Sequence, residues 1–191
     1  AWARSLGVRG RSAKVDIVMP YPWLSGQAVF EGESRQREVS GFADPRFRYS
    51  VNLYGAPALS LKEFADFQQD VIIGASLQVS VPVGQYDDSK LVNIGTNRWA
   101  FKPELGISKS WGSWTVDMAA AVALYTDNTD FLGGGVVSQD PLYAVQGHVV
   151  HGFRSGIWLA LDGTYYWGGR TTLNAVKADT LKKNTRLGLT V

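Results

Sequence analysis

The residues of this chain that could do chemistry include its two histidines, His148 and His151. On a strand, side chains three residues apart point to opposite faces, so these two imidazoles cannot share a metal ion. A hydrolase needs a nucleophile, a base and an orienting group on one face, and no serine stands in a recognisable nucleophile motif. The chain has no cysteine, which excludes a disulfide framework and a Cys-based zinc site. The sequence therefore predicts a protein that is not an enzyme and has no catalytic residues.

Two kinds of stretch resemble ligand-binding motifs without matching them. "TDNTD" (Thr126–Asp130) offers three oxygen-bearing side chains, but their spacing differs from that of an EF-hand, and such clusters are ordinary in turns. The glycine-rich stretches "LGGGV" and "WGGR" lack the strand-to-helix setting and the lysine of a phosphate-binding loop. We therefore expect no metal site and no cofactor.

A set of polar residues that alternate with apolar ones is more informative. Placed on strands, they would share one face. They could line a pore and set its charge preference. They could instead pair with one another across a narrow lumen and only satisfy buried charges. Their mixed signs argue against strong selectivity for either anions or cations. The pore-lining candidates are Arg46, Arg48, Gln78, Lys102, Glu104, Asp117, His148, Asp162 and Arg186.

Long strands must position these residues. In residues 71–83 the odd positions read Val, Ile, Ala, Leu, Val, Val, Val, whereas the even positions are small or polar after the first. This two-residue period predicts a strand with one apolar face. The same alternation recurs in residues 13–21, 46–55, 98–111, 113–126, 140–153 and 156–169.

Three further stretches bear on the expected elements. Residues 59–69 do not alternate and predict one short helical segment. Pro103 cannot donate to a ladder, so it predicts a local bulge or gap. Tight turns at 111–113 and 154–155 alternate with longer polar connections at 85–97, 127–139 and 169–182.

The apolar face could pack inside a soluble β-barrel or face lipid in a transmembrane one. Many patterned segments are longer than the roughly 9–11 residues that cross a bilayer as a tilted strand. Aromatic residues stand near segment ends on the apolar face, as in interfacial girdles, and short turns alternate with long loops. These features favour an antiparallel up-and-down transmembrane β-barrel. The aromatic residues are Trp99, Phe101, Trp114, Tyr143, Phe153, Tyr165 and Trp167.

Composition agrees with a single folded domain. The 191 residues are 45% hydrophobic and carry a formal net charge of +2 with both signs interspersed, which argues against a nucleic-acid partner. "AWARSLG" and "TRLGLTV", at the two ends, read as strand interiors. We therefore expect residues 1–191 to form one barrel domain, as a fragment truncated at both ends.

Three stretches resemble an outer-membrane, transporter-like β-barrel family named for the MetA pathway of phenol degradation. They are "GFADPRFRYSVNLYGAPAL", "VPVGQYDDSKLVNIGTNRWAFKPELGIS" and "GIWLALDGTYYWGGRTT". The resemblance implies a barrel in the outer membrane of a Gram-negative bacterium, with the lipid bilayer and small hydrophobic or aromatic solutes as partners. It also implies passive or facilitated uptake of those compounds, for which a gap at Pro103 could serve as a lateral opening. The alternatives are a non-transporting envelope barrel with a structural or adhesive role, and a soluble ligand-binding β-barrel.

Overall fold

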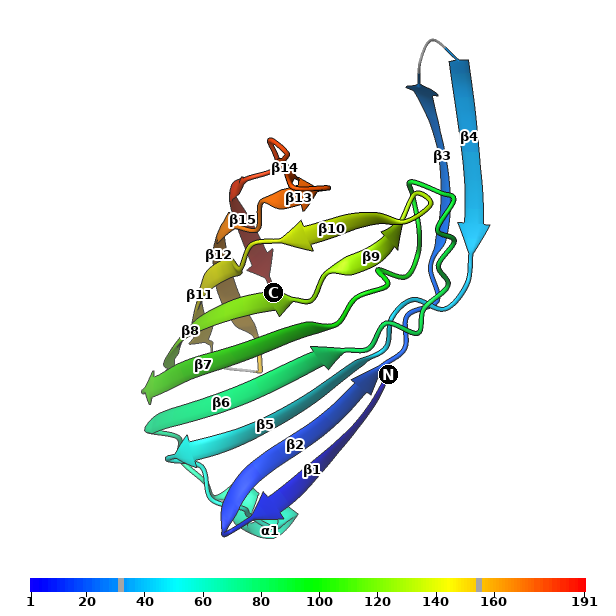
Figure 1. Ribbon diagram of the computed structural model, residues 1–191. Coiled ribbons are helices and arrows are strands. Elements are labelled where there is room, and N and C mark those ends of the chain that lie inside the picture. The colour runs from blue at the N-terminus through cyan, green and yellow to red at the C-terminus, as the bar shows by residue number, and fades with distance from the viewer. Residues whose placement is uncertain (31–32, 154–155) are drawn as a thin grey trace.

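The protein is almost entirely antiparallel β structure (Figure 1). The computed structural model describes residues 1–30, 33–153 and 156–191. Its largest unit is a nine-stranded sheet in the order β1-β2-β5-β6-β7-β8-β11-β12-β15. The strands are β1 (Trp2–Val8), β2 (Arg11–Val18), β5 (Arg46–Tyr54), β6 (Val71–Ser80), β7 (Ala100–Trp111), β8 (Trp114–Tyr125), β11 (Leu142–Gly152), β12 (Trp158–Gly168) and β15 (Lys182–Thr190).

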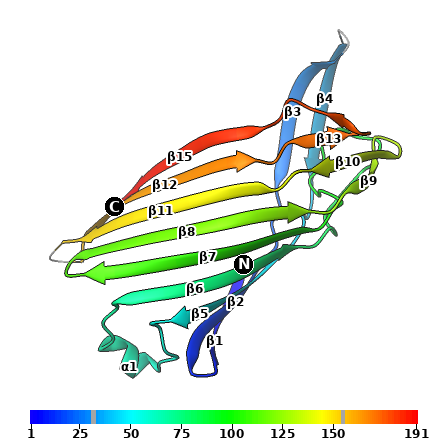
Figure 2. The same ribbon diagram turned by 60° about the vertical axis from the view of Figure 1, so that its left-hand side comes forward.

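The nine-stranded sheet is curved but not closed. Each of its strands pairs with the next strand of the sheet along the chain, as in an up-and-down barrel. β1 and β15 form its two edges (Figures 1 and 2). This arrangement is a partial barrel and confirms the predicted fold class.

The apolar side chains of the sheet are on its exposed face. Leu77, Leu105 and Met118 are 44%, 60% and 55% exposed, and the buried hydrophobic residues among those described are only Ala13, Ala144 and Ala160. A soluble barrel would bury its large apolar side chains in a core. The exposed apolar face therefore has the arrangement of a lipid-facing surface.

Aromatic side chains border this apolar face at both ends of the strands. On β7, Phe101 and Trp111 share the face and are ten positions apart. At about 3.3 Å per residue and a tilt of about 40°, they are separated by about 25 Å along a barrel axis, the height of an outer-membrane apolar band. On β11 and β12, at the end of the sheet where Phe101 lies, Tyr143 stacks on Trp167 with ring centroids 5.4 Å apart.

The tight turns lie at one end of the sheet, which we call the short-turn end. Arg9 and Gly10 join β1 to β2 with φ of 51° and 76°, and both φ values are positive, as in a type I′ hairpin turn. Gly112 and Ser113 join β7 to β8, as predicted. The turn expected at 154–155 lies outside the described residues.

The opposite end, the long-loop end, has more structure than expected. The connections at 127–139 and 169–182, expected to be loops, each contain a pair of short strands, and β10 pairs with β13 across the two connections. Such a pairing between distant segments leaves no periodic signal in either one. A further hairpin projects from this end (Figure 1). The strands are β3 (Trp23–Phe30), β4 (Glu33–Ser40), β9 (Asn128–Phe131), β10 (Gly135–Gln139), β13 (Thr171–Leu173) and β14 (Val176–Lys177).

The predicted helical segment is present but short. α1 spans Leu61–Ala65, begins at the N-cap Ser60 and ends at the C-cap Asp66, so it covers only the middle of the expected residues 59–69. In the described part of the chain, no helix is both long and apolar enough to cross a membrane.

Pro103 interrupts the sheet on one side only. The β6–β7 ladder continues through Leu77 and Pro103, whereas the β7–β8 ladder skips Lys102 and Pro103 and resumes at Glu104 in the same register. Proline therefore produces the predicted gap rather than a bulge, because a missing amide donor removes pairing without inserting a residue.

Candidate pore wall

The strand register places all nine pore-lining candidates on one face of the sheet, which we call the polar face. Arg48 lies opposite Gln78, and Gln78 lies opposite Lys102. Farther along the sheet, His148 lies between Asp117 and Asp162 on three neighbouring strands. The other three candidates are assigned to the same face by alternation within their strands or by cross-strand register.

The first cluster on this face lies on β5, β6 and β7. Arg48 donates a hydrogen bond from Nη2 to Gln78 Oε1 over 2.9 Å. Lys102 Nζ is 3.1 Å from Glu104 Oε2, and both side chains are about two-thirds buried. Arg46 is exposed at the long-loop end of the same face, opposite Ser80. These contacts join neighbouring positions along the wall and leave the space in front of it open.

The second cluster lies on β11, β12 and β15. Gln146 Nε2 donates to His148 Nε2 over 2.5 Å, and His148 Nδ1 is paired with Asp162. Thr190 donates to the other oxygen of Asp162 over 3.4 Å. Asp117 lies opposite His148 on the far side from Asp162, so a carboxylate flanks the imidazole on each neighbouring strand. This cluster fixes the orientation of the imidazole through contacts at both ring nitrogens.

Arg186 is near this second cluster but outside its hydrogen bonds. Its strand position is opposite Thr164, and its guanidinium carbon lies 5.3 Å from the ring centroid of Tyr166. A guanidinium over an aromatic face is held by the quadrupole of the ring. The charge of Arg186 is therefore positioned against the wall.

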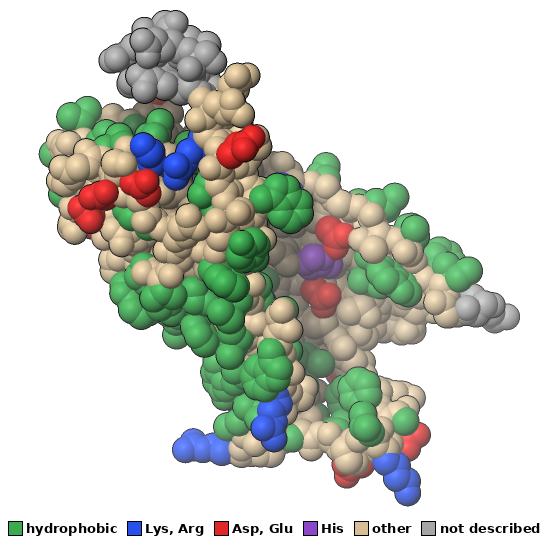
Figure 3. All heavy atoms as spheres, turned by 90° about the vertical axis from the view of Figure 1, so that its right-hand side faces the viewer, with side chains coloured by type: hydrophobic (Ala, Val, Ile, Leu, Met, Phe, Trp, Pro, Cys, Tyr) green, Lys and Arg blue, Asp and Glu red, His purple; other side chains and the backbone are tan. Residues whose placement is uncertain are grey.

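A hollow of about 280 Å³ separates the two clusters. Its floor is made of residues with little or no side chain, including Gly74, Gly106 and Ala119, and its rim includes Arg48 and His148. Figure 3 shows this hollowed side, where histidine and acidic side chains lie, next to a wall covered outside by hydrophobic side chains. The small residues are what makes room for water or a solute.

The polar face also carries charged residues that are not among the nine candidates. Lys14 and Asp16 on β2 lie 3.4 Å apart, and Asp16 is opposite Arg48. Their alternation with Val15 and Ile17 is the signal that could have identified them. Gln146 lies on the same face, as its alternation with the apolar residues of 140–153 predicts.

A buried polar network at the long-loop end had no such signal. Asp44 is 6% exposed and accepts hydrogen bonds from the amides of Gly84 and Thr96, over 2.9 and 2.8 Å, and from Thr96 Oγ1 over 2.6 Å. A Cβ on Gly84 would lie 2.6 Å from the Asp44 amide nitrogen, so only glycine fits there. The network holds the segment 85–97 against the end of the sheet.

Asn128, within the stretch Thr126–Asp130, joins this network. It is 4% exposed, donates to the Tyr86 hydroxyl over 2.8 Å and accepts from Asn97 over 3.0 Å. Its amide therefore serves to connect loops. Within the described residues, no group of three or more His, Asp or Glu side chains could hold a metal ion.

Comparisons with known proteins agree with this architecture. Residues 1–191 match the family described as "Putative MetA-pathway of phenol degradation". A search of curated proteins finds no significant match. Among 17 matching chains of solved structures is an outer membrane channel from Pseudomonas putida F1, with a TM-score of 0.66 and 20% sequence identity. The match covers 96% of this chain and 74% of that one.

The likeness in fold confirms the predicted outer-membrane β-barrel architecture, and both findings agree with the predicted location in the bacterial outer membrane. The match extends over the whole chain and includes the three stretches that carry the resemblance in the sequence. The chain belongs to the MetA-pathway phenol-degradation family of outer-membrane β-barrels.

Proposed function

We propose that residues 1–191 belong to one barrel domain that lets small molecules cross the outer membrane passively, without covalent chemistry. The observation that carries this proposal is the division of the sheet into an exposed apolar face and a polar face with a hollow. A wall of this kind encloses a polar lumen when the barrel is complete. In this proposal the nine candidates line that lumen.

We further propose that the solutes are small and hydrophobic or aromatic. The support is the family to which the chain belongs and the hollow, whose floor offers apolar contact without bulk. Most charges of the wall are paired with neighbours or bonded to polar side chains, so the lumen presents few free charges to an uncharged solute.

The test is conductance of the refolded protein in a planar lipid bilayer. Lys102→Ala removes a positive charge from the proposed lumen and should raise preference for cations, and Glu104→Ala should raise preference for anions. Lys109→Ala is the matched control, because Lys109 is on the apolar face of the same strand and should leave ion preference unchanged.

Reduction of the open-channel current by small aromatic alcohols, compared with aliphatic alcohols of similar size, then tests the solute class. Steady channels that respond to Lys102 and Glu104 but discriminate no aromatic solute would support the pore and reject the aromatic preference. A silent bilayer despite verified insertion would reject the pore. It would favour a closed barrel acting through the strands at its long-loop end.

A further inference from the structure

The connection between β5 and β6 differs from the two short turns described at the same end of the sheet. It runs from residue 55 to residue 70 and contains α1 (Figures 1 and 2). Its first part is bound to the β1–β2 turn, since the Ser12 amide donates to Ala56 O over 3.1 Å and the Ala58 amide donates to Gly10 O over 2.9 Å. This part of the connection is therefore held against the edge of the wall.

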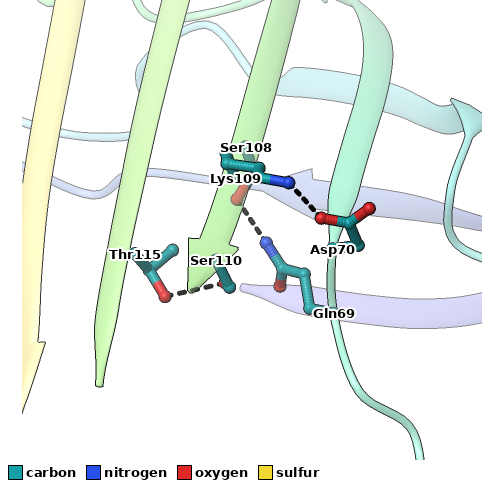
Figure 4. A network of polar contacts seen from close by, with 6 residues as sticks. All are labelled: Gln69, Asp70, Ser108, Lys109, Ser110 and Thr115. Carbon is teal, nitrogen blue, oxygen red and sulfur yellow. Dashed lines mark hydrogen bonds and ion pairs between the residues drawn. The ribbon is translucent and has the colours of Figure 1, made fainter. Parts of the chain in front are cut away.

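The last part of the connection is held to β7 by side chains on both faces of the strand (Figure 4). Gln69 Nε2 donates to Ser108 Oγ over 2.5 Å on the polar face, and Asp70 pairs with Lys109 on the apolar face. The Ser110 amide also donates to Asp70 O over 3.0 Å. Contacts on both sides keep this part at the rim of the barrel.

Between these two attachments, α1 is stabilised by its own residues. Ser60 and Glu63 form a reciprocal capping box, in which the Glu63 carboxylate accepts from the Ser60 amide over 2.8 Å. None of the helix residues is buried. The protein thus maintains a short helix without using its apolar side chains to pack it.

Those apolar side chains share one side of the segment. Leu61 and Phe64 are one turn apart, and they are 93% and 65% exposed. Phe64 stacks on Phe67 with ring centroids 6.4 Å apart. The 3.6-residue period places Lys62 and Asp66 on the other side. α1 is therefore a short amphipathic element with an unpaired apolar side.

We propose that this apolar side lies in the headgroup region of the lipid leaflet at the short-turn end. The proposal rests on the membrane location in the proposed function. It is supported by continuity with the exposed apolar face, since Tyr54 and Ile73 flank the connection at 64% and 38% exposure. Leucine and phenylalanine beside a charged side are the composition of interfacial segments.

Two other occupants fit the observations less well. A segment plugging the lumen would bury its apolar side chains, and Leu61 is almost fully exposed. A stable protein partner covers about 800 Å² on each side, which is more than three side chains of this size supply. Lipid requires no such minimum area, because the barrel itself already holds the segment at the membrane surface.

The absence of cysteine allows a direct test by single-site labelling. Leu61→Cys and Phe64→Cys carry a nitroxide on the apolar side, and Lys62→Cys and Asp66→Cys are matched controls on the other side. The refolded protein is placed in vesicles of phosphatidylethanolamine and phosphatidylglycerol. Collision of the nitroxide with oxygen, which concentrates in lipid, is compared with collision with a water-soluble nickel chelate.

We expect positions 61 and 64 to favour oxygen over the nickel chelate several-fold more than positions 62 and 66 do. Equal access of the chelate to all four positions would overturn the proposal, because the helix would then lie in water. Shielding of positions 61 and 64 from both reagents would also overturn it, because protein would then cover them. Conductance of the unlabelled protein is measured separately, so a silent channel does not decide the outcome.

Discussion

At the scale of single residues, Asp44 is the side chain whose loss should have the clearest effect. Its carboxylate accepts three hydrogen bonds from Gly84 and Thr96 while almost inaccessible to water. Removing a buried partner leaves donors unsatisfied, at about 1–3 kcal/mol for each group. The carboxylate therefore holds two distant parts of the chain together at the long-loop end of the sheet.

Asp44→Ala should loosen the segment 85–97 without unfolding the nine-stranded sheet. The expected result is faster hydrogen exchange at the amides of Gly84 and Thr96, with unchanged exchange in β7 and β8. Asp88→Ala, an exposed position in the same segment, serves as the control and should leave these rates unchanged. Unchanged exchange at Thr96 in the Asp44 variant would show that the loop is held by other contacts.

At the scale of elements, the gap beside Pro103 is a local property of the β7–β8 pair. Position 103 lies opposite Val122 in the register, but a proline has no amide hydrogen to donate there. The rest of β7 is paired on both sides, so the gap is confined to two positions.

Pro103→Ala should restore a donor and close the gap. The amide that this substitution introduces is expected to be protected from hydrogen exchange to the same degree as the amide of Leu105. If the gap is a lateral opening for apolar solutes, the same variant should also slow their passage while leaving ion conductance intact. Rapid exchange at position 103 would mean that the two strands stay apart for a reason other than the missing donor.

At the scale of the whole molecule, the two faces of the sheet should respond oppositely to the same charge. Met118 and Ala119 are consecutive on β8, but Met118 is on the exposed apolar face and Ala119 lines the hollow. An arginine facing lipid near the midplane costs about 2–4 kcal/mol, whereas one facing a lumen remains hydrated.

Met118→Arg should therefore make folding into lipid vesicles less favourable by about that amount. Ala119→Arg should leave it nearly unchanged and should instead alter conductance. The free energy of folding of both variants can be measured by equilibrium folding into vesicles in urea. Equal losses for the two variants would contradict the assignment of the faces.

Much of the fold could be predicted because the signal for it is local. Alternation along one strand identifies its two faces, so Arg48, Lys102 and Asp162 could each be assigned without knowledge of neighbouring strands. The aromatic residues at strand ends followed from the same pattern. The short strands at 127–139 and 169–182 could not be predicted, because each is too short to show an alternation and because β10 also pairs with β13 across the two connections.

The sequence by itself thus determined that long amphipathic strands form, which residues share their polar face, and where Pro103 interrupts a strand. Only the tertiary structure decided which of those residues meet. Arg48 bonds Gln78, 30 residues away, and Asp44 bonds Thr96, 52 residues away. The physical reason is that a side-chain period belongs to one strand, whereas register and loop contacts depend on free energies shared between distant segments.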